Sequence, residues 1–317
     1  MTNERAEAGN NSPAAALLFM DKVGRQVTAW ARYRVMYIMM IPVVIYFLIF
    51  SYYPLIKGLQ ISMQNFRIIG NRPFVGLQNY ITVWNDPVFW RVLENTLIIG
   101  VGMLIVGFFA PIITALSLNE VLKTWFKKLT QMVIYLPHLF SWVVVGGIWI
   151  IMLSPDGGFV NDLLKLLGAA KPIHFFAEVD YAQALMVLTN TWKEMGFTCI
   201  LYLASIVTIS PSLYEAARMD GAGRWQQIRY VTLPQLIPTM KVVTLLNMIG
   251  MLRMFDQMII LSNPVIARKV DVLMTYTYQK GILEFKMGVA SAAGFLVVLA
   301  TLILVFATRK LIRYDEE

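Results

Sequence analysis

The chain has 317 residues, 58% of them hydrophobic and 15% charged, and its mean hydropathy is +0.62. These values exclude an ordinary soluble globular protein and indicate a membrane protein. The net charge of +8 would suit nucleic acid in a soluble protein, but in a membrane protein it indicates topology, so no nucleic-acid partner is expected. Cys199, the single cysteine, excludes a disulfide framework and a cysteine metal cluster.

Apolar runs long enough to cross a bilayer as helices follow one another along the chain. They predict about six spans, at residues 35–53, 92–118, 129–153, 182–207, 236–261 and 287–308. A polar tail, 1–33, precedes this transmembrane domain of residues 34–310, and a short tail, 311–317, follows it. The predicted fold class is therefore an all-α polytopic membrane protein.

Lysine and arginine residues predict the orientation of these spans. They gather before the first span, after the second, between the fourth and the fifth, and after the sixth, whereas the other connecting segments spread theirs more thinly. Because positive residues favour the cytoplasmic side, both termini and the segment 208–235 are expected to face the cytoplasm.

Polar side chains inside a span are costly in lipid, so they mark a candidate path for a solute. The fourth span carries such residues at i, i+3, i+4 and i+7, a spacing that places them on one helical face. The candidate substrate-path residues are Asn190, Lys193, Glu194 and Phe197 in the fourth span and Asn247, Met251, Arg253 and Met254 in the fifth. Amides, charges and an aromatic face are what a sugar requires. The alternative is structural: Lys193 pairs with Glu194 or a partner subunit, and Asn247 contacts a neighbouring helix.

Signatures of catalysis are missing from the sequence. It contains no G-x4-G-K-[ST] phosphate-binding loop, so the chain is not expected to hydrolyse ATP. Its two histidines, His138 and His174, lie far apart and outside any H-E-x-x-H pattern, and no Ser/His/Asp set can be argued. We therefore expect no catalytic residue, metal or cofactor on this chain, and a packed or pore-facing role for His138.

The segment between the fourth and fifth spans is polar although apolar runs flank it. Residues Pro211–Met219 predict a short helix capped by Ser210, and Gly221 allows a sharp turn after it. A second helical piece is expected to end at Leu233–Pro234. A solvated segment of this size between spans indicates a partner or a dedicated purpose.

This segment also carries a family resemblance. Glu215-Ala216-Ala217, three residues, Gly221, nine residues and Val231-Thr232-Leu233-Pro234 resemble the E-A-A-x3-G-x9-I-x-L-P loop of bacterial ABC-importer permeases, with Val231 in place of isoleucine. The stretch Phe255–Pro264 resembles the F-D-x4-L-T-N-G-G-P stretch of sugar-type permeases, without its Gly-Gly. The chain is thus similar, over nearly its whole length, to permeases of maltose, glycerol-phosphate and oligosaccharide importers, and within them most of all to alginate-oligosaccharide permeases.

The resemblance implies the type I ABC importer permease fold and transport by alternating access in a bacterial cytoplasmic (inner) membrane. The loop would be the coupling helix that docks on an ATPase, with coupling residues Glu215, Ala216, Ala217, Asp220, Gly221, Leu233 and Pro234. The implied partners are a second permease subunit, two ATPase subunits that bind ATP-Mg, an external solute-binding protein, membrane lipid and an oligosaccharide substrate.

Other functions stay open at this point. An importer for another solute, such as glycerol phosphate, is the first alternative. A membrane-embedded enzyme is disfavoured by the missing catalytic set, and a receptor or structural membrane protein is disfavoured by the spacing of the loop motif.

Overall fold

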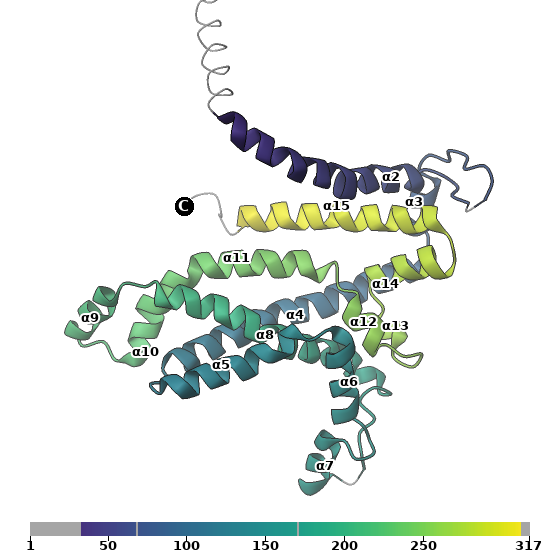
Figure 1. The fold of residues 1–317 in the computed structure, drawn as a ribbon. Coiled ribbons are helices and arrows are strands. Elements are labelled where there is room, and N and C mark those ends of the chain that lie inside the picture. Colours follow the sequence, from purple (N-terminus) through teal and green to yellow (C-terminus); the bar gives the residue numbers. More distant parts are fainter. Residues whose placement is uncertain (1–32, 68, 170, 312–317) are drawn as a thin grey trace, which may run out of the picture. The chain divides into compact units, whose positions relative to one another are not determined.

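The computed structural model describes residues 33–67, 69–169 and 171–311. The predicted N-terminal tail up to residue 32 and the C-terminal tail from residue 312 lie outside the described residues. The chain divides into two compact units, Met1–Gln60 and Ile61–Glu317. Apart from an isolated bridge between Gln64 and Phe74, the described residues form helices and the loops between them (Figure 1).

One long helix makes up the described part of the first unit. It begins at Tyr33 and runs to Ser62, and it contains the π-helical turn η1 (Leu48–Tyr52) and then α2 (Tyr53–Ser62). The predicted span ended at residue 53, but the helix passes Pro54. A proline inside a helix lacks the amide hydrogen and its ring clashes with a preceding carbonyl. The wide π-turn directly before Pro54 is where the backbone adapts to this change.

The second unit consists of helices joined mostly by short loops. The helices before the polar segment are α3 (Gln78–Trp84), α4 (Pro87–Asn119), α5 (Thr124–Leu139), α6 (Trp142–Met152), α7 (Phe159–Leu166) and α8 (Val179–Val207). The later ones are α9 (Pro211–Met219), α10 (Arg224–Gln227), the π-turn η2 (Ile228–Thr232), α11 (Leu233–Met251), α12 (Asp256–Leu261), α13 (Ala267–Val270), α14 (Leu273–Tyr278), the π-turn η3 (Gln279–Leu283) and α15 (Met287–Leu311).

Helix α8 lies at the centre of this second unit. It packs against α4, α5 and α11, and it also contacts α12 and α13 (Figure 1). Buried apolar side chains fill both ends of this arrangement, with Met186 near the start of α8 and Tyr202 near its end. Close packing of this kind, rather than burial from water, holds helices together in lipid. Polar groups on α8 are therefore held between neighbouring helices.

Two of the predicted spans are interrupted. The third, 129–153, consists of α5 and α6, which are bent by 107° relative to each other. The bend follows Pro137, at Phe140 and Ser141, where the backbone is extended. The fifth, 236–261, leaves the helix after Met251 and resumes it only at Asp256. Non-helical backbone at membrane depth is tolerated where it borders a cavity. The cavity described below is lined by His138 and Trp142, which flank the first break, and by Arg253 and Met254 within the second.

The structure does not confirm the predicted count of six spans. By length and composition, three helices are apolar enough to cross a membrane, namely Tyr33–Ser62, Pro87–Asn119 and Met287–Lys310. Counting each bent pair, α5 with α6 and α8 with α9, as one span gives up to five within the described residues. Helix α11 stays outside this count because two prolines, Gln235, Lys241 and Asn247 lower its hydropathy.

The polar segment also ends differently from the prediction. Elements α10, η2 and α11 follow one another without a gap from Arg224 to Met251, so the helix does not stop at Leu233–Pro234. As in the first unit, a π-turn stands directly before a proline, here Pro234. The segment that follows the sharp turn at Gly221 is therefore continuous with α11.

Asp86 fixes the N-terminal end of α4. Its carboxylate accepts hydrogen bonds from the Val88 amide and the Tyr276 hydroxyl, both at 2.9 Å, and lies 3.5 Å from the Lys280 ammonium. Burial by itself raises the pKa of Asp86, but these three partners outweigh it and hold the pKa below its usual range. The start of α4 is thus joined to α14 and η3, the elements that lead into α15.

Candidate functional site

A cavity of about 400 Å³ lies between α4, α5, α8, α11 and α12, which is within the size range of small-ligand sites. Helix α4 contributes mostly small and apolar residues, such as Gly100 and Gly107. The polar side chains come from the other helices and from the loop between α11 and α12. They are His138, Asn190, Thr191, Glu194, Thr198, Asn247, Arg253, Asp256 and Gln257.

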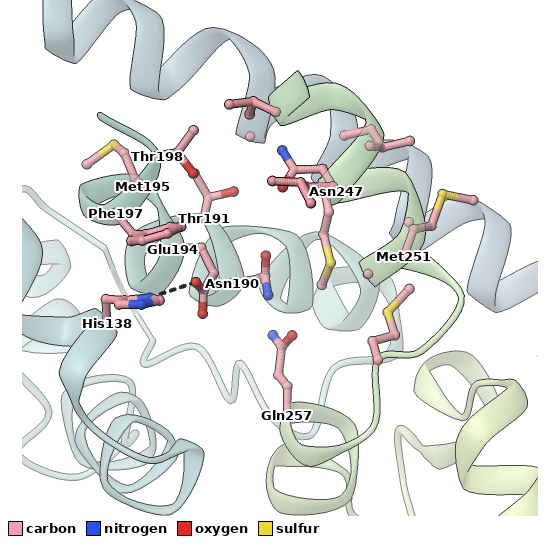
Figure 2. A pocket seen from close by; sticks show the side chains of 18 of the residues that line it. His138, Asn190, Thr191, Glu194, Met195, Phe197, Thr198, Asn247, Met251 and Gln257 are labelled. Atoms are coloured by element: carbon pink, nitrogen blue, oxygen red, sulfur yellow. Dashed lines mark hydrogen bonds and ion pairs between the residues drawn. The ribbon is translucent and has the colours of Figure 1, made fainter. Parts of the chain in front are cut away.

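Helix α8 presents one face to this cavity, as its spacing predicted. Asn190, Glu194 and Phe197 all line it, one turn apart along the helix (Figure 2). The Glu194 carboxylate and the His138 ring nitrogen Nδ1 form a hydrogen bond of 2.8 Å. The His138 ring in turn stacks on Phe197 at a centroid distance of 4.7 Å and an interplanar angle of 12°. The stacking covers one face of each ring, and both side chains belong to the cavity lining.

Lys193, by contrast, does not line the cavity. Its ammonium donates to the backbone oxygen of His138 and to Glu194 Oε1, both at 3.2 Å, and its side chain is only 8% exposed. The carbonyl of His138 is one of the last in α5 and has no amide partner within that helix. A lysine that binds such a carbonyl caps the helix and complements its dipole. Lys193 thus forms the ion pair with Glu194 that the structural alternative predicted, and it is not among the residues that line the cavity.

Gly196 explains why α5 and α8 can approach this closely. A Cβ atom at this position would collide with the backbone of Ile134 and Tyr135 in α5. The absence of a side chain therefore sets the distance between the helices that carry His138 and Glu194.

The far wall comes from α11 and the break after it. Asn247, Met251, Arg253 and Met254, all predicted from the sequence, line the cavity. Arg253 is exposed, and its guanidinium has no ion pair or hydrogen bond with any residue in the described part of the chain. With Lys193 occupied, Arg253 is the cationic side chain in the cavity lining.

The amide side chains of this cavity differ from amides elsewhere in the second unit. The side-chain nitrogens of Asn95, Asn161 and Asn263 all donate to backbone oxygens and so hold loops in place, and the Asn95 oxygen also accepts from the Gln183 side chain. Asn190 and Asn247 make no side-chain hydrogen bond to any of the described residues. Half-buried amides without protein partners are suited to bind hydroxyl groups of a solute.

Sequence reasoning missed part of this lining. Thr191 and Thr198 were not predicted, although they lie on α8 beside the predicted face. Asp256 and Gln257 were not predicted as site residues either, because the break between α11 and α12 resets the helical register. Because the backbone after Met251 is not helical, the helical period gave no signal for the direction of these two side chains.

A second candidate site is the polar segment around α9. Glu215 and Ala216 are exposed, Ala217 is half-buried, and Pro211 occupies the first helical position as predicted. Ser210 occupies the predicted N-cap position, but its hydroxyl contacts the Ser212 hydroxyl and makes no capping hydrogen bond to the helix backbone. The exposed face of α9 is the small-residue surface that the loop motif predicted.

Gly221 ends α9 in a Schellman motif. Its amide donates to the carbonyl of Arg218 at 3.1 Å, and the Ala222 amide donates to the carbonyl of Ala217 at 2.9 Å. The motif requires a left-handed residue, and Gly221 has φ +76°. The preceding residue, Asp220, is exposed at the helix C-cap.

Two contacts connect this segment to the rest of the unit. Tyr214 and Thr232 share a hydroxyl hydrogen bond of 3.0 Å, which links α9 to η2. Arg224 forms an ion pair of 3.0 Å with Glu120 at the end of α4. The predicted coupling residues Leu233 and Pro234 open α11 directly after η2.

Comparisons with known proteins agree with this arrangement. A family model described as "Binding-protein-dependent transport system inner membrane component" matches residues 107–313. The chain belongs to this family. A member of this family is a membrane-embedded permease subunit of an ABC importer and not an enzyme, and the resemblance seen in the loop motif is confirmed.

Several relatives of this permease are sugar transport proteins. The polygalacturonan/rhamnogalacturonan permease YteP of Bacillus subtilis is 34% identical over 98% of each chain, and the arabinooligosaccharide permease AraP of the same organism is 32% identical over 87% of each. The crystal structure of a bacterial ABC transporter involved in import of the acidic polysaccharide alginate has a chain with a TM-score of 0.84, 34% identity and coverage of 92% of this permease and 100% of that chain. The predicted fold class is thereby confirmed.

Proposed function

We propose that this permease is the transmembrane subunit of an ATP-driven, binding-protein-dependent importer of oligosaccharides that works by alternating access. The observation that carries the proposal is the cavity at the centre of the second unit. It combines the amides of Asn190 and Asn247, which have no partner among the described residues, with the aromatic rings of His138 and Phe197. Amides bind hydroxyl groups, and flat rings pack against the apolar faces of sugar rings.

Within oligosaccharides, we propose substrates that carry carboxylates. One relative is named for polygalacturonan/rhamnogalacturonan transport, and a solved relative is described as involved in import of the acidic polysaccharide alginate. In this chain Arg253 supplies a guanidinium that faces the cavity without a protein partner in the described residues. A guanidinium binds a carboxylate with two parallel hydrogen bonds, which makes it the natural contact for a uronate.

The partners follow from the two faces of the permease. The exposed α9, with Glu215 and Ala216 on its surface, is proposed to dock on a separate ATPase subunit that binds ATP-Mg and supplies the energy. A solved relative is described in complex with an alginate pentasaccharide-bound periplasmic protein. By analogy, an external binding protein delivers the sugar here, and a second permease subunit completes the path.

Uptake into proteoliposomes tests this function. The permease is reconstituted with its second permease subunit, the ATPase pair and the binding protein, with ATP inside or outside as orientation requires. We expect ATP-dependent uptake of uronate oligosaccharides that exceeds uptake of glycerol phosphate at least tenfold, since the smaller solute keeps an anionic group for Arg253 but loses several hydroxyl contacts. Uptake of glycerol phosphate without uptake of any oligosaccharide would disprove the proposed function.

The orientation is tested by labelling single introduced cysteines in whole cells. Lys165→Cys on α7 is expected to react with an impermeant maleimide from outside, and Gln226→Cys on α10 only after permeabilisation. Both positions are exposed and so accessible to the reagent. Asn161, in the same helix as Lys165, would be a poor labelling site because it is 5% exposed and hydrogen-bonded to the backbone. The native Cys199 is 1% exposed and serves as an internal control that should stay unlabelled. Labelling of Gln226→Cys in intact cells would contradict the predicted topology.

A further inference from the structure

One cavity residue has hydrogen-bonding capacity that the protein does not use. Gln257, in the first turn of α12, is 2% exposed and borders the cavity, and its side chain points from α12 toward Asn190 on α8 (Figure 2). Its side-chain oxygen Oε1 has no hydrogen-bond donor among the described residues. A buried acceptor in this condition costs free energy unless a donor reaches it in some state of the protein.

The direction of this amide is fixed by its nitrogen. Nε2 donates to the backbone oxygen of Met186 and to the hydroxyl of Thr189, both at 2.7 Å. A backbone carbonyl can only accept, so the nitrogen must face Met186. The Thr189 hydroxyl donates its own hydrogen to the carbonyl of Leu185 at 2.9 Å and is left as an acceptor. Both amide hydrogens are therefore used, and a flipped amide would set its oxygen against two acceptors.

Three other buried side-chain atoms also lack a partner in the described part of the chain: Arg91 Nε, Trp149 Nε1 and Tyr202 OH. None of these three residues lines the cavity, whereas Gln257 does. Gln257 is also the one of the four that offers only an acceptor. The unpaired oxygen therefore belongs to a residue of the cavity lining, although the atom itself is buried in this state, and a solute hydroxyl is the donor that another state of the transport cycle would bring to it.

We propose that Gln257 presents Oε1 as a fixed hydrogen-bond acceptor for one hydroxyl group of the transported sugar, a role that rests on the proposed function. An acceptor held in this way favours a hydroxyl and repels a carboxylate oxygen. Arg253, near the other end of the break between α11 and α12, has the opposite preference. Together the two residues would select sugars whose carboxylate and hydroxyl groups are spaced to reach both of them. They would thereby fix the position of the oligosaccharide along the cavity.

The test compares the parent oligosaccharide with a series of analogues that each lack one hydroxyl. Maximal uptake is measured at saturating loaded binding protein, so that the binding protein's own preference is the same for every permease. We expect the wild-type permease to prefer the parent over one of the analogues by about five- to tenfold, the effect of one hydrogen bond. Gln257→Met and Gln257→Cys should lose this one preference and keep those against the other analogues.

Thr189→Val is the control for a purely structural role. It removes one anchor of the Gln257 amide but leaves Oε1 and the Met186 contact in place, so the preference should remain. The proposal is overturned if the Gln257 variants slow uptake of all sugars equally, if they retain the wild-type preference, or if neither of them assembles while Thr189→Val does. Absence of any sugar uptake by the wild-type complex would instead refute the proposed function.

Discussion

Gly221→Val is expected to uncouple transport from ATP hydrolysis while the permease still inserts and assembles. Gly221 is held at φ +76° by the Schellman motif that ends α9, and a β-branched residue is strained there. No atom lies within 4 Å of the position of a Cβ, so the penalty is conformational and not a clash. Strain of about 1–3 kcal/mol lowers the population of the turn in its docked geometry by about five- to 150-fold. Sugar-stimulated ATPase activity of the reconstituted complex should fall accordingly.

The chain contains a matched control for this substitution. Gly168 ends α7 in the same motif, with its amide bonded to Lys165 and the Ala169 amide bonded to Leu164, and it has φ +98° with no atom within 4 Å of a Cβ. Gly168→Val thus imposes the same kind of strain on the other predicted side of the membrane. It should leave the stimulated ATPase activity close to that of the wild type. Equal losses in both variants would mean that the strain acts on the fold and that α9 has no special coupling role.

Arg253→Gln is expected to lower uptake of acidic oligosaccharides about tenfold relative to neutral ones of the same length. The substitution removes a charge-assisted contact, which is worth about 1.5–3 kcal/mol, but keeps a polar side chain. Its matched control is Lys193→Met, which also removes one positive charge from the same region. Because Lys193 caps α5 and pairs with Glu194, its loss should affect acidic and neutral sugars alike.

Proteoliposome uptake with paired acidic and neutral sugars measures both variants. If Lys193→Met selectively reduces uptake of the acidic sugar and Arg253→Gln does not, the assignment of the two cations is the wrong way round. If neither variant changes the ratio of acidic to neutral sugar uptake, another subunit must bind the carboxylate.

Local patterns made most of the candidate coupling segment predictable. The helix Pro211–Met219 and the turn at Gly221 follow from nearby residues: a proline suited to the first turn, and a glycine suited to a left-handed cap. The continuation through Pro234 was not predictable, because a π-turn depends on the tertiary context and leaves no simple sequence signal. Proline rules alone placed a helix end where the structure has none.

In the cavity, helical spacing placed Asn190, Glu194 and Phe197 on one face, and the structure brings them together. The same reasoning put Lys193 there too, although adjacent residues on a helix point about 100° apart. Its long side chain reaches the end of α5, a partner 55 positions away that the sequence cannot show. Gln257 was missed because the chain leaves the helix after Met251, and no period carries across that break.

The unbroken run of α10, η2 and α11 has a mechanical consequence. From Arg224 to Asn247 the backbone is helical without an intervening loop, and the π-turn η2, Pro234 and Pro238 lie within this run. The segment proposed to dock on the ATPase and an amide proposed to bind the sugar are therefore joined by hydrogen-bonded helical backbone. If docking moves α10, we expect the motion to reach Asn247 through α11, with η2 as the place where the helix can bend.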